Sequence, residues 1–264
     1  SAIDAANPGD TVFVYDGYYF EEIITNKTVI LKGESNQNTI VWGGFNVSAN
    51  STTIEGFKIV YGMEWDPDNS GPNGIYKIGI YAKSSLNLFL NNSISNMLGG
   101  NGENRTGTWS RGGDGGAGCG IYLFNSEMNE IKKNNFSEIT GGKGGLGDGG
   151  PTYGGDGGIG CAIYLHDSKS NIIINNTMFD LNGGKGGRGN GWLSNNLMGL
   201  GGIGCGIFLY QSDDNVMENT SIETVLGGNG EVGWNNNGGI GGTGSGFYIK
   251  DPFNNLLNLN YIYD

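Results

Sequence analysis

One motif occurs four times in this chain, and each copy follows a glycine-rich segment. The copies are GCGIYLFNSEMNEI at Gly118, GCAIYLHDSKSNII at Gly160, GCGIFLYQSDDNVM at Gly204 and GSGFYIKDPFNNLL at Gly244. Their equivalent apolar residues are Ile121, Ile163, Ile207 and Phe247, spaced by 42, 44 and 40 residues, and a related segment around Ile80 lies 41 residues before the first. A fixed motif at a nearly fixed period predicts a solenoid, in which each repeat buries its apolar edge against its neighbours.

The amino-acid composition argues against a disordered protein, a nucleic-acid-binding protein and a membrane-spanning protein. Glycine accounts for 53 of 264 residues and proline for only 5, so the bias is periodic glycine and not the mixed signature of disorder. A net charge of -12 argues against nucleic acid, which needs clustered lysine and arginine. The sequence has no run of 18 apolar residues that would span a membrane. It begins at Ser1 without a signal-like segment, so we expect any secretion signal to have been removed or to lie outside this sequence.

Eight asparagines stand in N-x-S/T sequons and are candidates for glycosylation. In a chain rich in Asn, Ser and Thr several such sites arise by chance, and most of these asparagines also suit solvent-facing turns. Taken together, they favour an extracellular or cell-surface protein. The candidates are Asn26, Asn46, Asn50, Asn91, Asn104, Asn135, Asn175 and Asn219.

The three cysteines occupy one repeat position, two residues before the apolar anchor. They are Cys119, Cys161 and Cys205, and Ser245 takes the place in the last copy. Residues two apart on a strand share a face, so each cysteine is expected to point into the interior together with its anchor. Buried free thiols are favoured over a disulfide, which would leave the third cysteine unpaired. No second ligand type recurs beside them, so a metal site is not expected.

Aromatic and asparagine positions also recur. The residue after the anchor is aromatic in all five copies, and His166, the only histidine, lies in a second aromatic row with Phe124 and Tyr210. Both rows are expected to face away from the cysteines, and the glycine segments are expected to cover the first. Asn129, Asn171, Asn215 and Asn255 recur eight residues after the anchor, where stacked amides pass hydrogen bonds between coils. The candidate ligand-binding residues are Tyr81, Tyr122, Tyr164, Phe208, Tyr248 and His166.

These residues resemble a known family. The opening AIDAANPGDTVFVYDGYYFEEIITNKTVILKGE from Ala2, the later TTIEGFKIVYG from Thr52 and the repeated GIYL-x-x-S-x-x-N-x-I pattern are similar to right-handed parallel β-helix repeat proteins. That family includes periplasmic copper-processing proteins and archaeal surface proteins. The resemblance implies an all-β fold, a right-handed parallel β-helix solenoid in a single domain over residues 1–264, with an N-terminal cap at 1–10. It does not determine the activity, because such folds host unrelated roles.

The glycine-rich insertions depart from the family. They occupy about 99–118, 141–160, 183–204 and 227–244, and each is glycine-rich on both sides of a tip, as in a hairpin. Their period of three matches the extended geometry of polyproline II and not the period of two of a strand. They resemble polyglycine II bundles of some phage adhesins and antifreeze proteins, so we expect glycine-rich hairpins stacked beside the solenoid. The alternative is flexible loops, because glycine loses much entropy on ordering.

Signals of catalysis and of metal binding are sparse. All three arginines lie in the glycine insertions, and the lone His166 is interpreted as a member of its aromatic row rather than a catalytic base. Asp66 and Asp68 in EWDPDNSG resemble half of a calcium loop, but the twelfth position is Lys77 and not Glu, which favours an acidic turn. The sequence therefore predicts no enzymatic activity, no cofactor and no metal.

Two functional interpretations follow. The first is a structural or adhesive cell-surface protein that assembles with itself, because an open β-helix end leaves strand edges for another subunit. The alternative is carbohydrate binding or polysaccharide processing along the aromatic row, where rings stack on sugars. Maturation of a copper protein is disfavoured by the lack of Met or His clusters. The expected partners are therefore the protein itself or a surface carbohydrate, and not nucleic acid.

Overall fold

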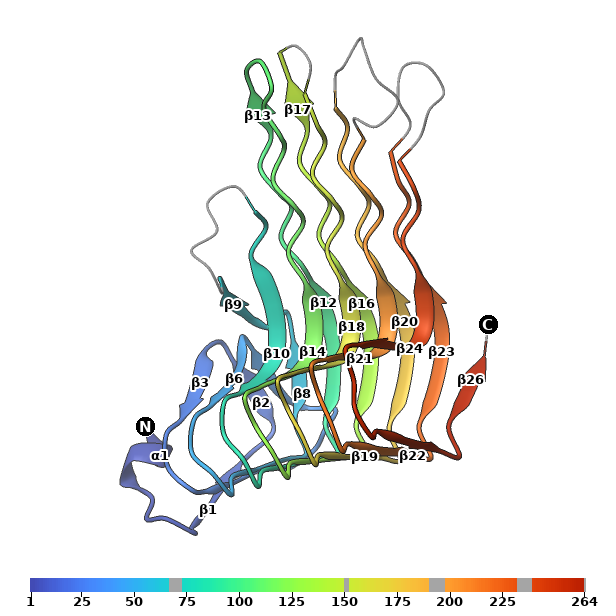
Figure 1. Ribbon diagram of the computed structural model, residues 1–264. Coiled ribbons are helices and arrows are strands. Elements are labelled where there is room, and N and C mark those ends of the chain that lie inside the picture. The colour runs from blue at the N-terminus through green and yellow to red at the C-terminus, as the bar shows by residue number, and fades with distance from the viewer. Residues whose placement is uncertain (67–72, 150–151, 190–197, 232–238, 264) are drawn as a thin grey trace.

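The chain folds into a stack of coils, each made of three short strands. A computed structural model describes residues 1–66, 73–149, 152–189, 198–231 and 239–263. In these residues the strands form three eight-stranded sheets, one along each side of the stack (Figure 1). Two of the sheets are wholly parallel, and the third has seven parallel strands and one antiparallel strand. The architecture is the solenoid that the repeats predict, in the form that the family resemblance implies, an all-β right-handed parallel β-helix.

Each sheet takes one strand from every coil, so its strands are far apart in the sequence. The first sheet contains β1 (Thr11–Val14), β4 (Ile30–Gly33), β7 (Thr53–Glu55), β11 (Leu88–Leu90), β15 (Glu130–Lys132), β19 (Ile172–Ile174), β22 (Val216–Glu218) and β25 (Leu256–Asn258). The second contains β2 (Gly17–Tyr19), β5 (Thr39–Trp42), β8 (Lys58–Val60), β12 (Ser93–Leu98), β16 (Asn135–Thr140), β20 (Thr177–Asn182), β23 (Ser221–Leu226) and β26 (Tyr261–Tyr263).

The third sheet carries the repeated motif. Its strands are β3 (Glu22–Thr25), β6 (Gly44–Val47), β10 (Tyr76–Ala82), β14 (Gly118–Phe124), β18 (Gly160–His166), β21 (Gly204–Tyr210) and β24 (Gly244–Lys250), and β9 (Met63–Trp65) pairs antiparallel with β10. Ile121 pairs with Ile163, Ile163 with Ile207 and Ile207 with Phe247. The periodicity in the sequence is therefore the coil length, and equivalent residues form columns.

The interior of the stack is a continuous apolar core. Its largest buried side chains include Phe45, Phe57, Phe89 and Phe136, which are at most 1% exposed. At the N-terminal end a short helix, α1 (Ala2–Ala5), lies over the first coil, with Ile3 packed against the core. Ser1 and Asp4 cap this helix reciprocally.

Two columns of asparagine amides connect the coils at their corners. Asn129 donates its side-chain amide to Asn171 Oδ1, and Asn171 donates to Asn215 Oδ1, each at 3.0 Å. This column also includes Asn87 and Asn255, and Asn92, Asn134 and Asn176 form a second one. Because buried amides without partners are costly, each column favours the stacked arrangement over any shifted register.

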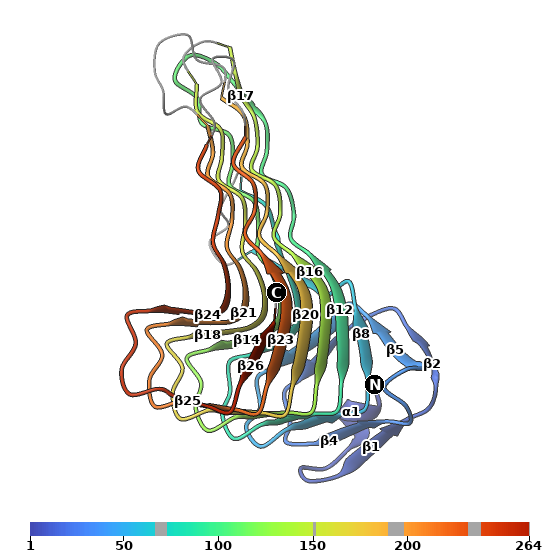
Figure 2. The ribbon, with the colours of Figure 1, turned by 90° about the vertical axis from the view of Figure 1, so that its right-hand side faces the viewer.

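The glycine-rich insertions extend from one corner of the stack, between the second and third sheets. An out leg continues each of β12, β16, β20 and β23, and a return leg leads into β14, β18, β21 and β24 (Figures 1 and 2). The tips include 150–151, 190–197 and 232–238, which lie outside the described residues. Two short strands, β13 (Arg105–Thr106) and β17 (Gly147–Asp148), pair near the ends of the first two insertions.

Hydrogen bonds in the legs follow a period of three, as the glycine spacing predicts. Three consecutive amides of one out leg donate in three directions: to the preceding out leg, to the next out leg and to a return leg. These bonds run from Lys143 to Asn101 Oδ1 (2.9 Å), from Gly144 to the Lys185 carbonyl (2.9 Å) and from Gly145 to the Gly113 carbonyl (2.7 Å). The described parts of the legs are thus ordered by backbone bonds, and their likeness to phage-adhesin polyglycine stays a prediction.

Glycine is required in the legs by close contact rather than by backbone conformation. A Cβ on Gly242 would collide with the carbonyl oxygen of Gly202, and one on Gly184 would collide with that of Gly142. The adjacent Gly241 differs, because its Cβ would meet only the Gly228 oxygen at 3.6 Å.

We therefore expect Gly242→Ala to destabilise the fold by about 1–3 kcal/mol through overpacking. Gly241→Ala is the matched control, because both changes reduce the entropy of the unfolded chain equally. Thermal and denaturant unfolding of the two variants measures the difference. Equal stabilities of the two variants would contradict close packing of the legs.

Candidate functional site

The outward face of the third sheet carries the predicted aromatic row. Tyr122 and Tyr164 stack with ring centroids 4.7 Å apart, and the row continues through Phe208 to Tyr248 at 4.6 and 4.9 Å. Tyr81 begins the row, 5.7 Å from Tyr122. The structure therefore brings together all five aromatic residues that the sequence predicts, each on an adjacent strand.

The cysteines lie beneath this row, and not in the interior as predicted. Cys119, Cys161 and Cys205 form a second apolar cluster with the aromatic row, separate from the core that contains their anchors. The alternation of faces breaks at Gly120 and Ile121: a Cβ on Gly120 would lie 2.6 Å from the Phe136 ring of the interior, and Ile121 is also in the core. Because Gly120 and Ile121 both face the interior, the preceding Cys119 faces outward, on the side of the aromatic row.

The thiols are free and fully buried, as predicted. The sulfur atoms of Cys119 and Cys161 are 3.6 Å apart. Burial raises the pKa of the Cys119 and Cys205 thiols, because a thiolate is poorly solvated there. They act as small apolar residues that join the sheet to the base of the glycine legs.

A cleft lies over the first part of the aromatic row, near the corner where the legs leave the sheet. Figure 2 shows the legs rising from this edge, so sheet and legs meet at an angle. Ile159 and Ile203 of the return legs pack against the aromatic cluster from that side. The cleft encloses about 530 Å³ and is lined by Trp65, Tyr76, Tyr81, Lys83, Tyr122, Phe124, Tyr164, His166 and Asp167.

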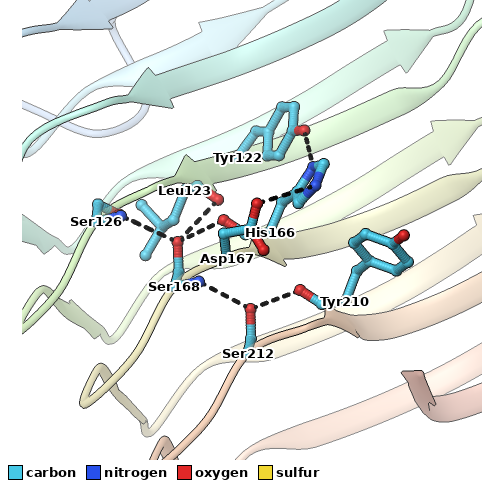
Figure 3. Close-up of polar contacts among 8 residues, drawn as sticks. All are labelled: Tyr122, Leu123, Ser126, His166, Asp167, Ser168, Tyr210 and Ser212. Carbon is cyan, nitrogen blue, oxygen red and sulfur yellow. Dashed lines mark hydrogen bonds and ion pairs between the residues drawn. The ribbon is translucent and has the colours of Figure 1, made fainter. Parts of the chain in front are cut away.

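His166 connects the polar groups of the cleft. Its Nδ1 lies 2.8 Å from the Tyr122 hydroxyl, and its Nε2 lies 3.5 Å from Asp167 Oδ2 (Figure 3). Both contacts are satisfied when Tyr122 donates to Nδ1 and the Nε2 proton faces Asp167. Phe124 and Tyr210 approach the imidazole edge-on, with centroids 5.1 and 4.8 Å away. The ring is thus fixed between two aromatic neighbours.

Burial shifts the pKa values of both His166 and Tyr122. Partial burial lowers the pKa of His166, and the charge of Asp167 opposes that shift. Burial raises the pKa of the Tyr122 hydroxyl far above its ordinary value. At neutral pH the imidazole is therefore neutral and the phenol protonated, so the tyrosine donates the hydrogen bond between them and Nδ1 of the histidine accepts it.

The serine column beside the cleft has a structural role. Ser168 Oγ lies 2.9 Å from the His166 carbonyl and 3.2 Å from the Leu123 carbonyl, and the Ser168 amide donates to Ser212 Oγ at 3.0 Å (Figure 3). These contacts fix the turn that follows β18 and so position His166 and Asp167. The hydroxyl is directed to backbone oxygens and not to the imidazole.

Several cleft residues were missed in the sequence. Lys83 stands in the same repeat position as Phe124, His166 and Tyr210, so the period itself contains this signal. Within the described residues, no carboxylate lies within ion-pair distance of Lys83, and its ammonium group stands 5.6 Å from the Phe124 ring centroid. Trp65 belongs to an excursion that has no repeat equivalent, so the period gives no signal for it. Tyr76 begins β10 at the repeat position of Ala117, Ile159 and Ile203, none of which is aromatic.

The remaining candidates lie away from the cleft. Among the sequon asparagines, only Asn46 is half-buried and the other seven are exposed, and their glycosylation stays a prediction. Of the calcium candidates, Asp66 follows β9, whereas Asp68 lies outside the described residues. In the part of the chain that is described, no three His, Cys, Asp or Glu side chains are grouped to hold a metal ion. None of the described helices is long and apolar enough to cross a membrane.

Comparison with known proteins finds similarity in structure only. No family model matches the chain, and no curated protein matches its sequence. A pectin methylesterase from Yersinia enterocolitica is similar with a TM-score of 0.40 and 11% identity, over 96% of this chain and 88% of that one. Pectin methylesterase PemA from Erwinia chrysanthemi has a TM-score of 0.35 and 13% identity, with 96% and 83% coverage. The PL6 family alginate lyase AlyGC has a TM-score of 0.30 and 12% identity, with 87% and 39% coverage.

These similarities correct one expectation from the sequence. The chain was expected not to be an enzyme, but the similar solved structures include pectin methylesterases and an alginate lyase. The expectation of a non-enzymatic protein is therefore withdrawn. The narrower resemblance to copper-processing and archaeal surface proteins stays a prediction, because no family model supports it.

The single histidine allows a direct measurement of the site. We expect the His166 imidazole to titrate below the ordinary value of about 6.5, with the proton of the neutral form on Nε2. Asp167→Asn is expected to lower the pKa further, because it removes the charge that favours the imidazolium. Nitrogen-15 NMR of the imidazole across a pH titration reports both the pKa and the tautomer. An ordinary pKa that does not respond to Asp167→Asn would contradict the described contacts.

Proposed function

We propose that the protein binds a polysaccharide in the cleft over the third sheet and acts on it there. The observation that carries this proposal is the combination of aromatic walls with a few polar groups in one cleft. Concave sites of this kind, mostly apolar with several directed polar groups, are typical ligand sites. The strands that form the cleft repeat about every 4.8 Å, a step comparable to the length of one pyranose unit.

The lining matches the chemistry of a sugar. Aromatic rings pack against the apolar C–H faces of pyranose rings, and Trp65, Tyr76 and Phe124 present half-buried rings to the cleft. Lys83 and Asp167 are exposed and can bind hydroxyl or carboxyl groups. Inner rings such as Tyr122 and Tyr164 stack on each other, so they form the floor rather than a platform for a sugar.

The same contacts suit processing of the bound chain. The one basic nitrogen of neutral His166 is Nδ1, and the Tyr122 hydroxyl already donates to it. A proton from a group bound in the cleft therefore reaches the imidazole through Tyr122, whose oxygen accepts that proton while its own proton passes to Nδ1. Accepting a proton becomes possible only above the lowered pKa of the imidazole. The proposal therefore includes an activity that increases as His166 loses its proton.

The other sequence-based roles receive less support. No described contact points to an adhesive or filamentous assembly, and the carbohydrate alternative explains the cleft. Self-association stays a proposal. An extracellular location also stays a proposal, supported by the exposed sequons.

Binding to a glycan array that includes esterified pectin, unesterified pectin and alginate tests the function. We expect Lys83→Gln and Asp167→Asn each to weaken binding about tenfold, which corresponds to about 1.4 kcal/mol. Lys133→Gln, an exposed change at the corner between the first and second sheets, is the control and should bind as the wild type does. Absence of glycan binding, or equal binding by all variants, would contradict the proposal.

A further inference from the structure

We propose that the cleft takes the end of a polysaccharide chain and not its middle, because the hairpin that carries Trp65 closes one side of it. This inference rests on the proposed function and specifies how the ligand lies. The segment that carries Trp65 connects β8 to β10. Its described residues form an antiparallel strand, β9, whereas the segments at the same place in the later coils are glycine legs.

The hairpin is held firmly on the sheet. Strand β9 pairs with β10 so that Glu64 faces Lys77, and their side chains form an ion pair at 2.6 Å. Met63, one residue earlier, is only 5% exposed and belongs to the aromatic and thiol cluster. The strand therefore has a buried anchor and a salt bridge next to Trp65, which fixes where the indole stands.

The indole covers the start of the aromatic row. Trp65 stacks on Tyr81 with ring centroids 5.1 Å apart, and it contacts Tyr122 edge-on at 5.3 Å. Tyr76 contacts the indole edge-on, with ring centroids 5.6 Å apart. The register position before Tyr81 is occupied by Asn46 of β6, which is not aromatic. The row therefore ends at the coil on which Trp65 stands.

The other end of the aromatic row, toward β24, is not closed by a ring from outside the row in the described residues. Phe208 contacts Tyr164 and Tyr248 of its own row, and in the described residues no aromatic ring from outside the row stacks on it. The later coils send their legs straight out of the stack instead of folding a hairpin onto the sheet (Figure 1). The row therefore continues past the cleft toward β24 without a wall like Trp65.

A cleft with one wall imposes a direction on a linear ligand. Its lining comes from three consecutive coils, β10, β14 and β18, which span about 10 Å. That length fits about two pyranose units between the indole and His166. A chain that continued past Trp65 would have to displace a side chain held by three rings, so the terminal units are the ones that fit.

The number of protein molecules bound per glycan chain tests this inference. The probes are oligogalacturonides and alginate oligosaccharides in short, intermediate and long forms, titrated by calorimetry into the whole protein. We expect the stoichiometry per chain to stay constant as the chains lengthen, because each chain offers the same number of ends. For Trp65→Ala we expect it to rise with length, because internal segments can then enter.

The controls separate the possible failures. Trp42→Ala removes an indole that stacks on Tyr61, outside the cleft, and should leave the stoichiometry independent of length. Thermal unfolding shows whether Trp65→Ala keeps the fold, and Tyr76→Ala, which removes the edge-on contact with the indole, serves as a second variant. Wild-type stoichiometry that rises with chain length would overturn the inference while leaving polysaccharide binding intact. Absence of binding to every probe would instead contradict the proposed function.

Discussion

In-register stacking of parallel coils is the constraint on which the whole structure depends. Backbone hydrogen bonds between coils exist only when equivalent residues lie side by side, and the amide columns through Asn129 and Asn134 are satisfied only in that register. The same register continues into the legs, where the amide of Gly158 donates to Gly142 and that of Gly184 donates to Gly158. The solenoid thus orders its insertions, and the insertions add bonds that only an aligned solenoid can make.

The legs also explain why glycine is so abundant in an ordered protein. Ordering glycine costs more conformational entropy than ordering any other residue, about 1–2 kcal/mol of backbone entropy for each residue fixed. In the legs this loss is offset by hydrogen bonds to several neighbouring segments, an arrangement that side chains would prevent. Larger residues do occur at the base of the legs. The side chains of Ile159 and Ile203 fit there because they pack against the aromatic cluster and not between the legs.

The sequence predicts the structural features that recur in every coil, but not those that occur at a single coil. The period predicts the coil length, the aromatic row and the amide column, because each stacked residue has an equivalent at every coil. The prediction that the thiols point into the interior was wrong, because the alternation breaks at Gly120 and Ile121, and a local break in the pleat changes no residue type. The cleft itself was not predictable, because Trp65 comes from an excursion without equivalents and Tyr76 has no aromatic equivalent in the later coils. The contact of Trp65 with the row depends on tertiary structure.

The two kinds of excursion give the site its form. Four glycine-rich insertions build a wall whose backbones pack too closely for side chains, and this wall stands beside the aromatic row along its length. The first excursion instead folds back as β9, and its indole ends the row at Tyr81. A groove that runs along every coil would have no preferred position for a ligand. By folding β9 with Trp65 onto the sheet at one coil, where the later coils have glycine legs, the chain converts a repetitive surface into a cleft with one closed end, next to its single histidine.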